Sequence, residues 1–199
     1  MTTNALAPAW GAVVSGEWLT IALRQALAAA SQRLGMQLER PLLVRRAAVE
    51  RWPLAHIADG IAALDAETVG VYLLLGDGLP GQAVLLASIE DARRVAGWML
   101  GEEPAAAGEL TEIERSALAE LGNVALSSVL NSLAARLAAP LLLSPPAVIV
   151  DMIGVIFDAI ATASAHTGDE LTGVVATLSD AAQTVELQLW LIPDLAGAR

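Results

Sequence analysis

The chain has 199 residues, a formal net charge of −11 and a pI near 4.5, and 55% of its residues are hydrophobic against 17% charged. So many apolar residues can form a core, which excludes a disordered chain, and the length favours a single domain over residues 1–199. The acidic charge, with no basic cluster beyond pairs such as Arg45–Arg46 and Arg93–Arg94, argues against nucleic acid as a partner.

The sequence contains no cysteine, which excludes disulfides and cysteine-ligated metal and is typical of intracellular proteins. The N-terminal segment MTTNALAPAW lacks the basic start and apolar core of a signal peptide. Charges, glycines or prolines interrupt every apolar run before the ~20 residues that a membrane-spanning helix needs. We therefore expect a cytoplasmic protein without membrane insertion.

The first half is expected to begin with a long helix near residues 16–35, which is rich in strong helix formers and ends at a glycine. A strand at 42–49 and a short helix at 57–65 follow. The apolar runs 68–75 and 81–88 are separated by glycines and a proline, which are typical turn residues. These two runs are therefore predicted to form an antiparallel hairpin.

The second half is expected to contain the longest helix. A helix at 89–100 and a loop precede it, and Thr111 with Glu114 forms the sequence pattern of a capping box, so the long helix should begin there. It should end near residue 138, because Pro140 cannot continue it. A strand at 147–150, a helix at 152–164 and two strands complete the prediction, and the last strand, 185–191, alternates apolar and polar residues as if one face met a core.

The two halves resemble each other at an offset of 103 residues. Between Glu17 and Leu43, seven of 27 positions are identical to the residue 103 places further on, although the abundance of Ala and Leu inflates this count. The same offset also aligns the predicted long helix, strand, short helix and hairpin in the same order. We therefore expect an internal duplication, with approximate halves at 1–103 and 104–199.

The second long helix carries a polar stripe. Ser116, Glu120 and Asn123 lie four and three residues apart, so they project from one helical face, which Ser127 and Asn131 extend. The flanking apolar residues are expected to bury against the sheet; they are Ile113, Ala117, Leu121 and Val124 on one side and Leu126, Leu130, Leu133 and Leu137 on the other. The plainer alternative is that every exposed helix needs a polar face.

A glycine also lies inside this long helix, at position 122. Glycine costs a helix interior about 1 kcal/mol relative to alanine. Its presence beside Asn123 therefore predicts that another backbone approaches the helix closely at this point.

The segment from Glu109 to Pro146 resembles the signature helix of the CheC/CheX/FliY family of CheY-P phosphatases, and CheC most closely. That family has an acidic residue or serine four residues before a glutamate, an asparagine three residues after it, and a proline 23 residues beyond the asparagine. Here these positions are Ser116, Glu120, Asn123 and Pro146, without a gap. The resemblance spans most of the chain and implies an α/β (α+β) fold of two similar halves, with long helices packed on a mainly antiparallel sheet.

The resemblance also implies a function, hydrolysis of the aspartyl phosphate of a phosphorylated CheY-like response regulator. Asn123 would position the attacking water, much as glutamine does in GTPases, and Glu120 would pair with a lysine of the regulator. Ser116 would support that contact, whereas Pro146 would set where the next strand begins. The protein would need no cofactor or metal of its own, because Mg²⁺ is expected on the bound regulator.

Many members of the family carry the motif twice, and the offset of 103 locates the first copy. Glu17 corresponds to Glu120, but Thr20 corresponds to Asn123. A threonine hydroxyl lacks the separate donor and acceptor ends of an amide, so this copy should be degenerate. We therefore predict one working site, on the second long helix.

Two other functions remain open. One is a non-catalytic interaction module, as in flagellar-switch relatives, and the other is an adaptor that binds a CheD-like deamidase or a different regulator. His56 and His166 have no companions at metal-ligand spacing and are expected to be structural or exposed. The five tryptophans are scattered and are expected to serve in packing.

Overall fold

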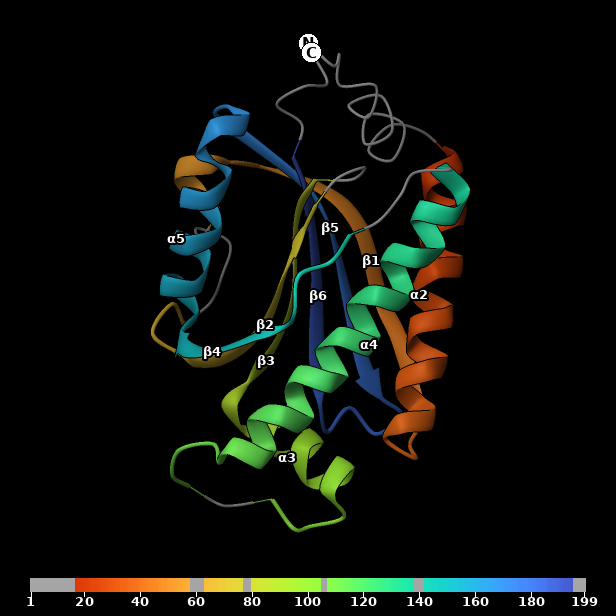
Figure 1. Ribbon diagram of the computed structural model, residues 1–199, viewed down its shortest axis with the longest axis vertical. Coiled ribbons are helices and arrows are strands. Elements are labelled where there is room, and N and C mark those ends of the chain that lie inside the picture. The colour runs from red at the N-terminus through yellow and green to blue at the C-terminus, as the bar shows by residue number, and fades with distance from the viewer. Residues whose placement is uncertain (1–16, 58–62, 77–79, 105–106, 138–141, 195–199) are drawn as a thin grey trace.

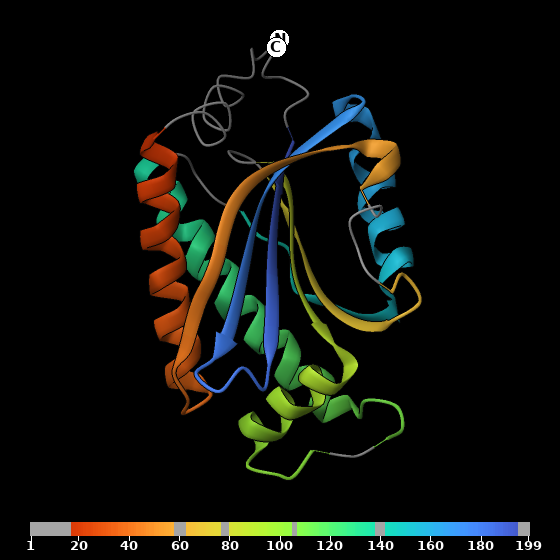
Figure 2. The ribbon, with the colours of Figure 1, turned by 180° about the vertical axis from the view of Figure 1, so that it is seen from behind.

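A computed structural model describes residues 17–57, 63–76, 80–104, 107–137 and 142–194. These residues form one six-stranded sheet with two long helices on one face and a shorter helix on the other (Figure 1). Seen from behind, the first strand arcs from the lower end of the first long helix towards the shorter helix (Figure 2). Within the described part of the chain, no helix is long and apolar enough to cross a membrane.

The elements largely follow the sequence-based expectation. The helices are α2 (Glu17–Gln37), α3 (Ile89–Leu100), α4 (Glu112–Leu137) and α5 (Ile153–Ser164), with short 3-10 turns η1 (Leu54–His56) and η2 (Ala165–Thr167). The strands are β1 (Leu42–Pro53), β2 (Glu67–Leu75), β3 (Gly81–Ser88), β4 (Ala147–Met152), β5 (Glu170–Asp180) and β6 (Glu186–Pro193).

The sheet has the strand order β1-β5-β6-β3-β2-β4, and all neighbours are antiparallel. Exchanging the halves, so that β1, β2 and β3 swap with β4, β5 and β6, reads the same order in reverse. The predicted fold class, with long helices on an antiparallel sheet built from two similar halves, is therefore confirmed. That one domain extends over all of residues 1–199 stays a prediction.

Side chains alternate between two cores on either side of the sheet. Along β3, Ala83 and Leu85 join the large core under α2, α3 and α4, whereas Val84 and Leu86 join a smaller core under α5. This alternation is the period of two that an extended strand imposes.

The last strand departs from the prediction that only one of its faces meets a core. Trp190 of β6 is 6% exposed, and its ring lies 4.8 Å from that of Phe157 and 5.0 Å from that of Trp52. The cause is α5, which covers the second face of the sheet at this point. Trp52 and Trp190 thus serve in packing, as predicted.

The predicted short helix at 57–65 is wrong in the part that can be described. Residues 58–62 lie outside the described residues, while Ile57 and residues 63–65 are not helical. Before this segment, β1 extends beyond the predicted residue 49 to Pro53, which pairs with Glu170 of β5, and η1 follows directly. The hydrogen bonds of the longer ladder with β5 account for the extra strand length.

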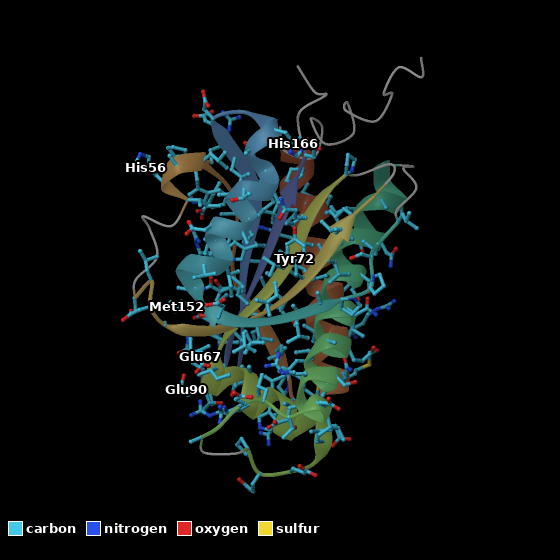
Figure 3. The ribbon with its side chains drawn as sticks, turned by 60° about the vertical axis from the view of Figure 1, so that its left-hand side comes forward. His56, Glu67, Tyr72, Glu90, Met152 and His166 are labelled. Carbon is cyan, nitrogen blue, oxygen red and sulfur yellow. The ribbon has the colours of Figure 1, made fainter. Side chains whose placement is uncertain are left out.

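The α5 face of the sheet contains a buried polar chain of hydrogen bonds. The Tyr72 hydroxyl donates to Gln82 Oε1, and Gln82 Nε2 donates to Ser164 Oγ at 2.8 Å. Burial raises the pKa of Tyr72 to about 12, so this phenol stays protonated at neutral pH. Figure 3 shows Tyr72 about midway along the molecule and His166 nearer its upper end.

Candidate active site

Helix α4 begins at the predicted capping box. Glu114 N donates to Thr111 Oγ1 at 3.3 Å, and Thr111 N donates to Glu114 Oε2 at 2.7 Å. The hydrogen bonds from the Thr111 backbone and hydroxyl hold the pKa of Glu114 below its ordinary value. The cap fixes where the helix begins.

The three polar residues of the motif share one open face of α4. Ser116 and Glu120 are exposed and Asn123 is partly buried, whereas Leu118 and Leu121 between them are 3% and 1% exposed. The structure therefore brings Ser116, Glu120 and Asn123 together where a partner protein can reach them. Figure 1 shows α4 crossing the sheet diagonally, with α2 beside it.

Gly122 sets the distance between this face and the sheet. A Cβ added there would lie 2.4 Å from Cγ1 and 2.5 Å from Cβ of Val71 in β2. The expected close approach is thus present, but the neighbour is a valine side chain and not a backbone. Any larger residue at position 122 would move the turn that carries Asn123.

Pro146 immediately precedes β4, the strand that pairs with β2 beside the Gly122 contact. Val71, on which Gly122 rests, is the register partner of Val148, two residues after Pro146. Ser144, two residues before Pro146, is also hydrogen-bonded to β2. Its backbone N donates to Leu74 O at 3.0 Å, and its Oγ accepts from Leu74 N at 2.9 Å. The α4 turn and the proline segment therefore meet at β2, although they are 23 residues apart in the sequence.

The charges on this face are acidic. Glu112 and Glu120 are exposed, and neither carboxylate has an ion-pair or hydrogen-bond partner among the described residues. The nearest arginine in sequence, Arg115, donates its Nε to Leu110 O at 3.4 Å. The described residues contain no group of three or more histidine, aspartate or glutamate side chains that could hold a metal ion.

Comparisons with known proteins give one partial sequence match and several structural matches. No protein-family model matches the chain. A Halobacterium salinarum protein, provisionally named CheY-P phosphatase CheC1, is 36% identical over 84 residues, which are 42% of this chain and 43% of that protein. The match thus spans less than half of that relative's length.

Solved structures match over most of the chain. Thermotoga maritima FliY superimposes with a TM-score of 0.64 at 23% identity and 86% coverage of each chain. A chain of the Borrelia burgdorferi CheX-CheY-BeF3-Mg complex gives 0.53 at 17% identity, covering 86% of this chain and 97% of that one. The FliM middle domain of Vibrio alginolyticus gives 0.59 at 9% identity, covering 89% and 94%. The chain has the fold of the CheC, CheX and FliY proteins.

The first long helix of this CheC-like fold, α2, packs against α4. Glu17 and Thr20, the degenerate copy of the motif, lie in its first turn. Their side chains lie outside the part that the structure describes. The prediction that this copy is inactive therefore stays a prediction.

The sequence-based prediction for one residue of α4 is wrong. Ile113 was expected on a buried face, but it is 62% exposed. It lies seven residues before Glu120, and seven residues are nearly two full helical turns, so Ile113 falls on the open face. The seven-residue spacing from Glu120 could have predicted that Ile113 is exposed, whereas its four-residue spacing from Ala117 suggested a buried position.

Both histidines are exposed, and neither belongs to α4. His166 Nε2 lies 2.9 Å from Asp194 Oδ2, and this hydrogen bond raises the pKa of His166 above its ordinary value. His56 lies in η1. These positions fit the structural or exposed roles expected of both residues.

Proposed function

We propose that the chain hydrolyses the aspartyl phosphate of a CheY-like response regulator. The observation that carries the proposal is the open face of α4, where Ser116, Glu120 and Asn123 project together while Leu118 and Leu121 between them are buried. The partial match to a protein provisionally named as a CheY-P phosphatase supports it. The fold shared with a chain of a CheX-CheY complex supports a CheY-like partner.

In this proposal Asn123 supplies the catalytic contact. Its amide accepts a hydrogen from a water molecule and directs the oxygen at phosphorus. The new bond joins that oxygen to phosphorus as the bond between phosphorus and the aspartate oxygen breaks, which releases inorganic phosphate and the free carboxylate. Asn123 needs no change of protonation, and its partial burial beside the Gly122 contact restricts its position.

Glu120 and its neighbours would fix the docking register. The exposed carboxylate of Glu120, which has no partner in the described part of the chain, suits a lysine of the regulator, and Ser116, one turn earlier, would support the edge of that contact. Pro146 would act indirectly, by starting β4 beside the α4 turn. Mg²⁺ bound by the regulator would neutralise the phosphoryl oxygens, so this chain would provide no cofactor.

The direct test follows loss of label from a regulator phosphorylated on aspartate, with Mg²⁺ present. The protein should accelerate the loss, and Asn123→Ala should reduce that acceleration by about 100-fold or more, the usual scale for a residue that orients the reacting group. Thr20→Ala is the matched variant on α2 and should retain full activity. Substantial activity in Asn123→Ala would refute the assigned site.

The same assay distinguishes hydrolysis from the remaining alternative, a non-catalytic module that binds a regulator or a CheD-like protein. The similarity of fold to the FliM middle domain keeps this alternative open. Unchanged decay of the label at high protein concentration, together with measurable binding of the regulator, would favour it.

A further inference from the structure

The open face of α4 contains an apolar residue that hydrolysis itself does not require. Ile113 is 62% exposed at the start of the helix, while Ala117, Leu118 and Leu121 after it are 9%, 3% and 1% exposed. A single exposed isoleucine is common on protein surfaces. The position of this one is informative, because it lies about 10 Å along the axis from Glu120 and on the same face.

Exposed carboxylates lie on either side of this isoleucine along the helix, and Arg115, two residues after it, donates its Nε to Leu110 O. Glu112 precedes it and Glu120 follows two turns later, and both are exposed and unpaired among the described residues. Glu114 adds negative charge here, but its carboxylate is held in the capping box with Thr111 and is not free to pair with a partner. The face therefore presents one apolar contact and two exposed carboxylates that are about 12 Å apart along the helix axis.

The charges also decide between possible occupants. A second copy of this chain would bring the same surface to itself, and a two-fold contact would then place the carboxylates of Glu112 and Glu120 against the same acidic surface of the other copy. Like charges at a contact disfavour such pairing. A partner with basic groups around an apolar side chain is complementary instead.

We infer that Ile113 is a docking residue for the response regulator, and that Glu112 adds a second electrostatic contact beyond Glu120. This inference rests on the proposed function for the identity of the partner. The regulator face would present a lysine to Glu120 beside the phosphorylated aspartate, and an apolar side chain with a further basic group about two helical turns away. Ile113 thus contributes to binding and does not touch the reacting atoms.

The test compares two isoleucines of similar exposure on the two long helices. Ile113→Ser should raise the KM for the phosphorylated regulator on the order of tenfold and leave kcat unchanged, because burying an isoleucine contributes equally to ground and transition states. Ile21 on α2 is 59% exposed, so Ile21→Ser is the matched control and should change neither constant. Glu112→Gln should raise KM by a smaller factor that vanishes in high salt.

The outcomes separate this inference from the proposed hydrolysis. If the wild-type protein is active and Ile113→Ser leaves KM unchanged, or if Ile21→Ser has an equal effect, the docking assignment is overturned while hydrolysis stands. If the wild-type protein binds the phosphorylated regulator without hydrolysing it, a weaker Kd in Ile113→Ser supports docking while hydrolysis fails. A change of oligomeric mass in Ile113→Ser would identify a contact between copies and overturn the inference.

Discussion

Glu120 and Asn123 differ in their surroundings although they are only three residues apart. Glu120 is exposed, whereas Asn123 is partly buried on the turn that Gly122 holds against β2. An exposed carboxylate is suited to long-range attraction and to a contact made on docking. A partly buried amide is suited to holding one orientation. Substitution of Glu120 should therefore weaken docking of the regulator, whereas substitution of Asn123 should slow the chemical step.

For Glu120→Gln we expect weaker docking with the chemical step preserved. The KM for the phosphorylated regulator should rise by about five- to twentyfold at low ionic strength, since a charge-assisted contact is replaced by a neutral one. Steady-state hydrolysis at two salt concentrations checks this, with Glu112→Gln as the weaker comparison. A fall in kcat with unchanged KM would instead assign Glu120 to the chemical step.

At the scale of elements, the site depends on how closely α4 approaches β2. The Gly122 contact with Val71 and the pairing of Val71 with Val148 join one helical turn, one central strand and one edge strand. Protein interiors are packed too densely to absorb an added methyl group without movement. A change at this contact should therefore affect stability and activity together.

Gly122→Ala tests this contact against helix propensity. Alanine is favoured in an isolated helix by about 1 kcal/mol, but its methyl group would lie 2.4 Å from Val71 Cγ1. We expect the free energy of unfolding to fall by about 1–2 kcal/mol because overpacking outweighs propensity. Denaturant unfolding measures the loss, and adding Val71→Ala should recover part of it. A more stable Gly122→Ala protein would show that α4 moves away freely.

The turn between β5 and β6 depends on one buried carboxylate. Asp180 is 9% exposed and accepts hydrogen bonds from Thr184 N at 2.7 Å, Thr184 Oγ1 at 2.9 Å and Val185 N at 3.0 Å. Desolvation acts to raise the pKa of Asp180, but these hydrogen bonds outweigh it and hold the pKa below its ordinary value of 3.8. The charged form is therefore the one that stabilises the turn.

Asp180→Asn should lower the free energy of unfolding by about 1–3 kcal/mol at pH 7. A lowered folded-state pKa gives stability that is present above the unfolded-state value and is lost as pH falls through the folded-state value. The difference between wild type and variant should thus shrink below pH 3.8. Thermal unfolding across this range checks it, with Asp158→Asn on the exposed face of α5 as the control. A difference that does not depend on pH would refute the electrostatic explanation.

At the scale of the whole molecule, a nearly symmetric fold carries an asymmetric motif. The strand order reads the same when the halves are exchanged, and α2 packs against α4. The asparagine, however, is present only on α4, since Thr20 occupies the corresponding place on α2. Symmetry of the backbone therefore does not imply two active faces.

We accordingly expect each chain to bind one phosphorylated regulator. Calorimetric titration should give a stoichiometry of one, and Asn123→Ala should keep that value because the contact of Glu120 is retained. A stoichiometry of two would show that α2 also docks a regulator, and Ile21→Ser should then reduce it.

The sequence by itself determined the elements whose cause is local: the capping box at Thr111, the spacing that aligns Ser116, Glu120 and Asn123, and the offset that relates the halves. Hydrogen bonds within a few residues and a fixed helical period decide these features. They were enough to predict the face of α4 that carries the motif, whereas the fold class was predicted from the resemblance to the CheC/CheX/FliY family.

Only the tertiary structure decided the rest, because it depends on contacts between distant residues. The second core under α5 buries Trp190, and pairing with β5 lengthens β1 beyond the predicted residue 49 to Pro53. The contact with Val71 explains why a glycine stands at position 122, since a side chain there would clash. The exposure of Ile113 places an apolar residue on the polar face of α4. Periodicity shows that a face exists, but which side chains another element covers is fixed only when the chain packs.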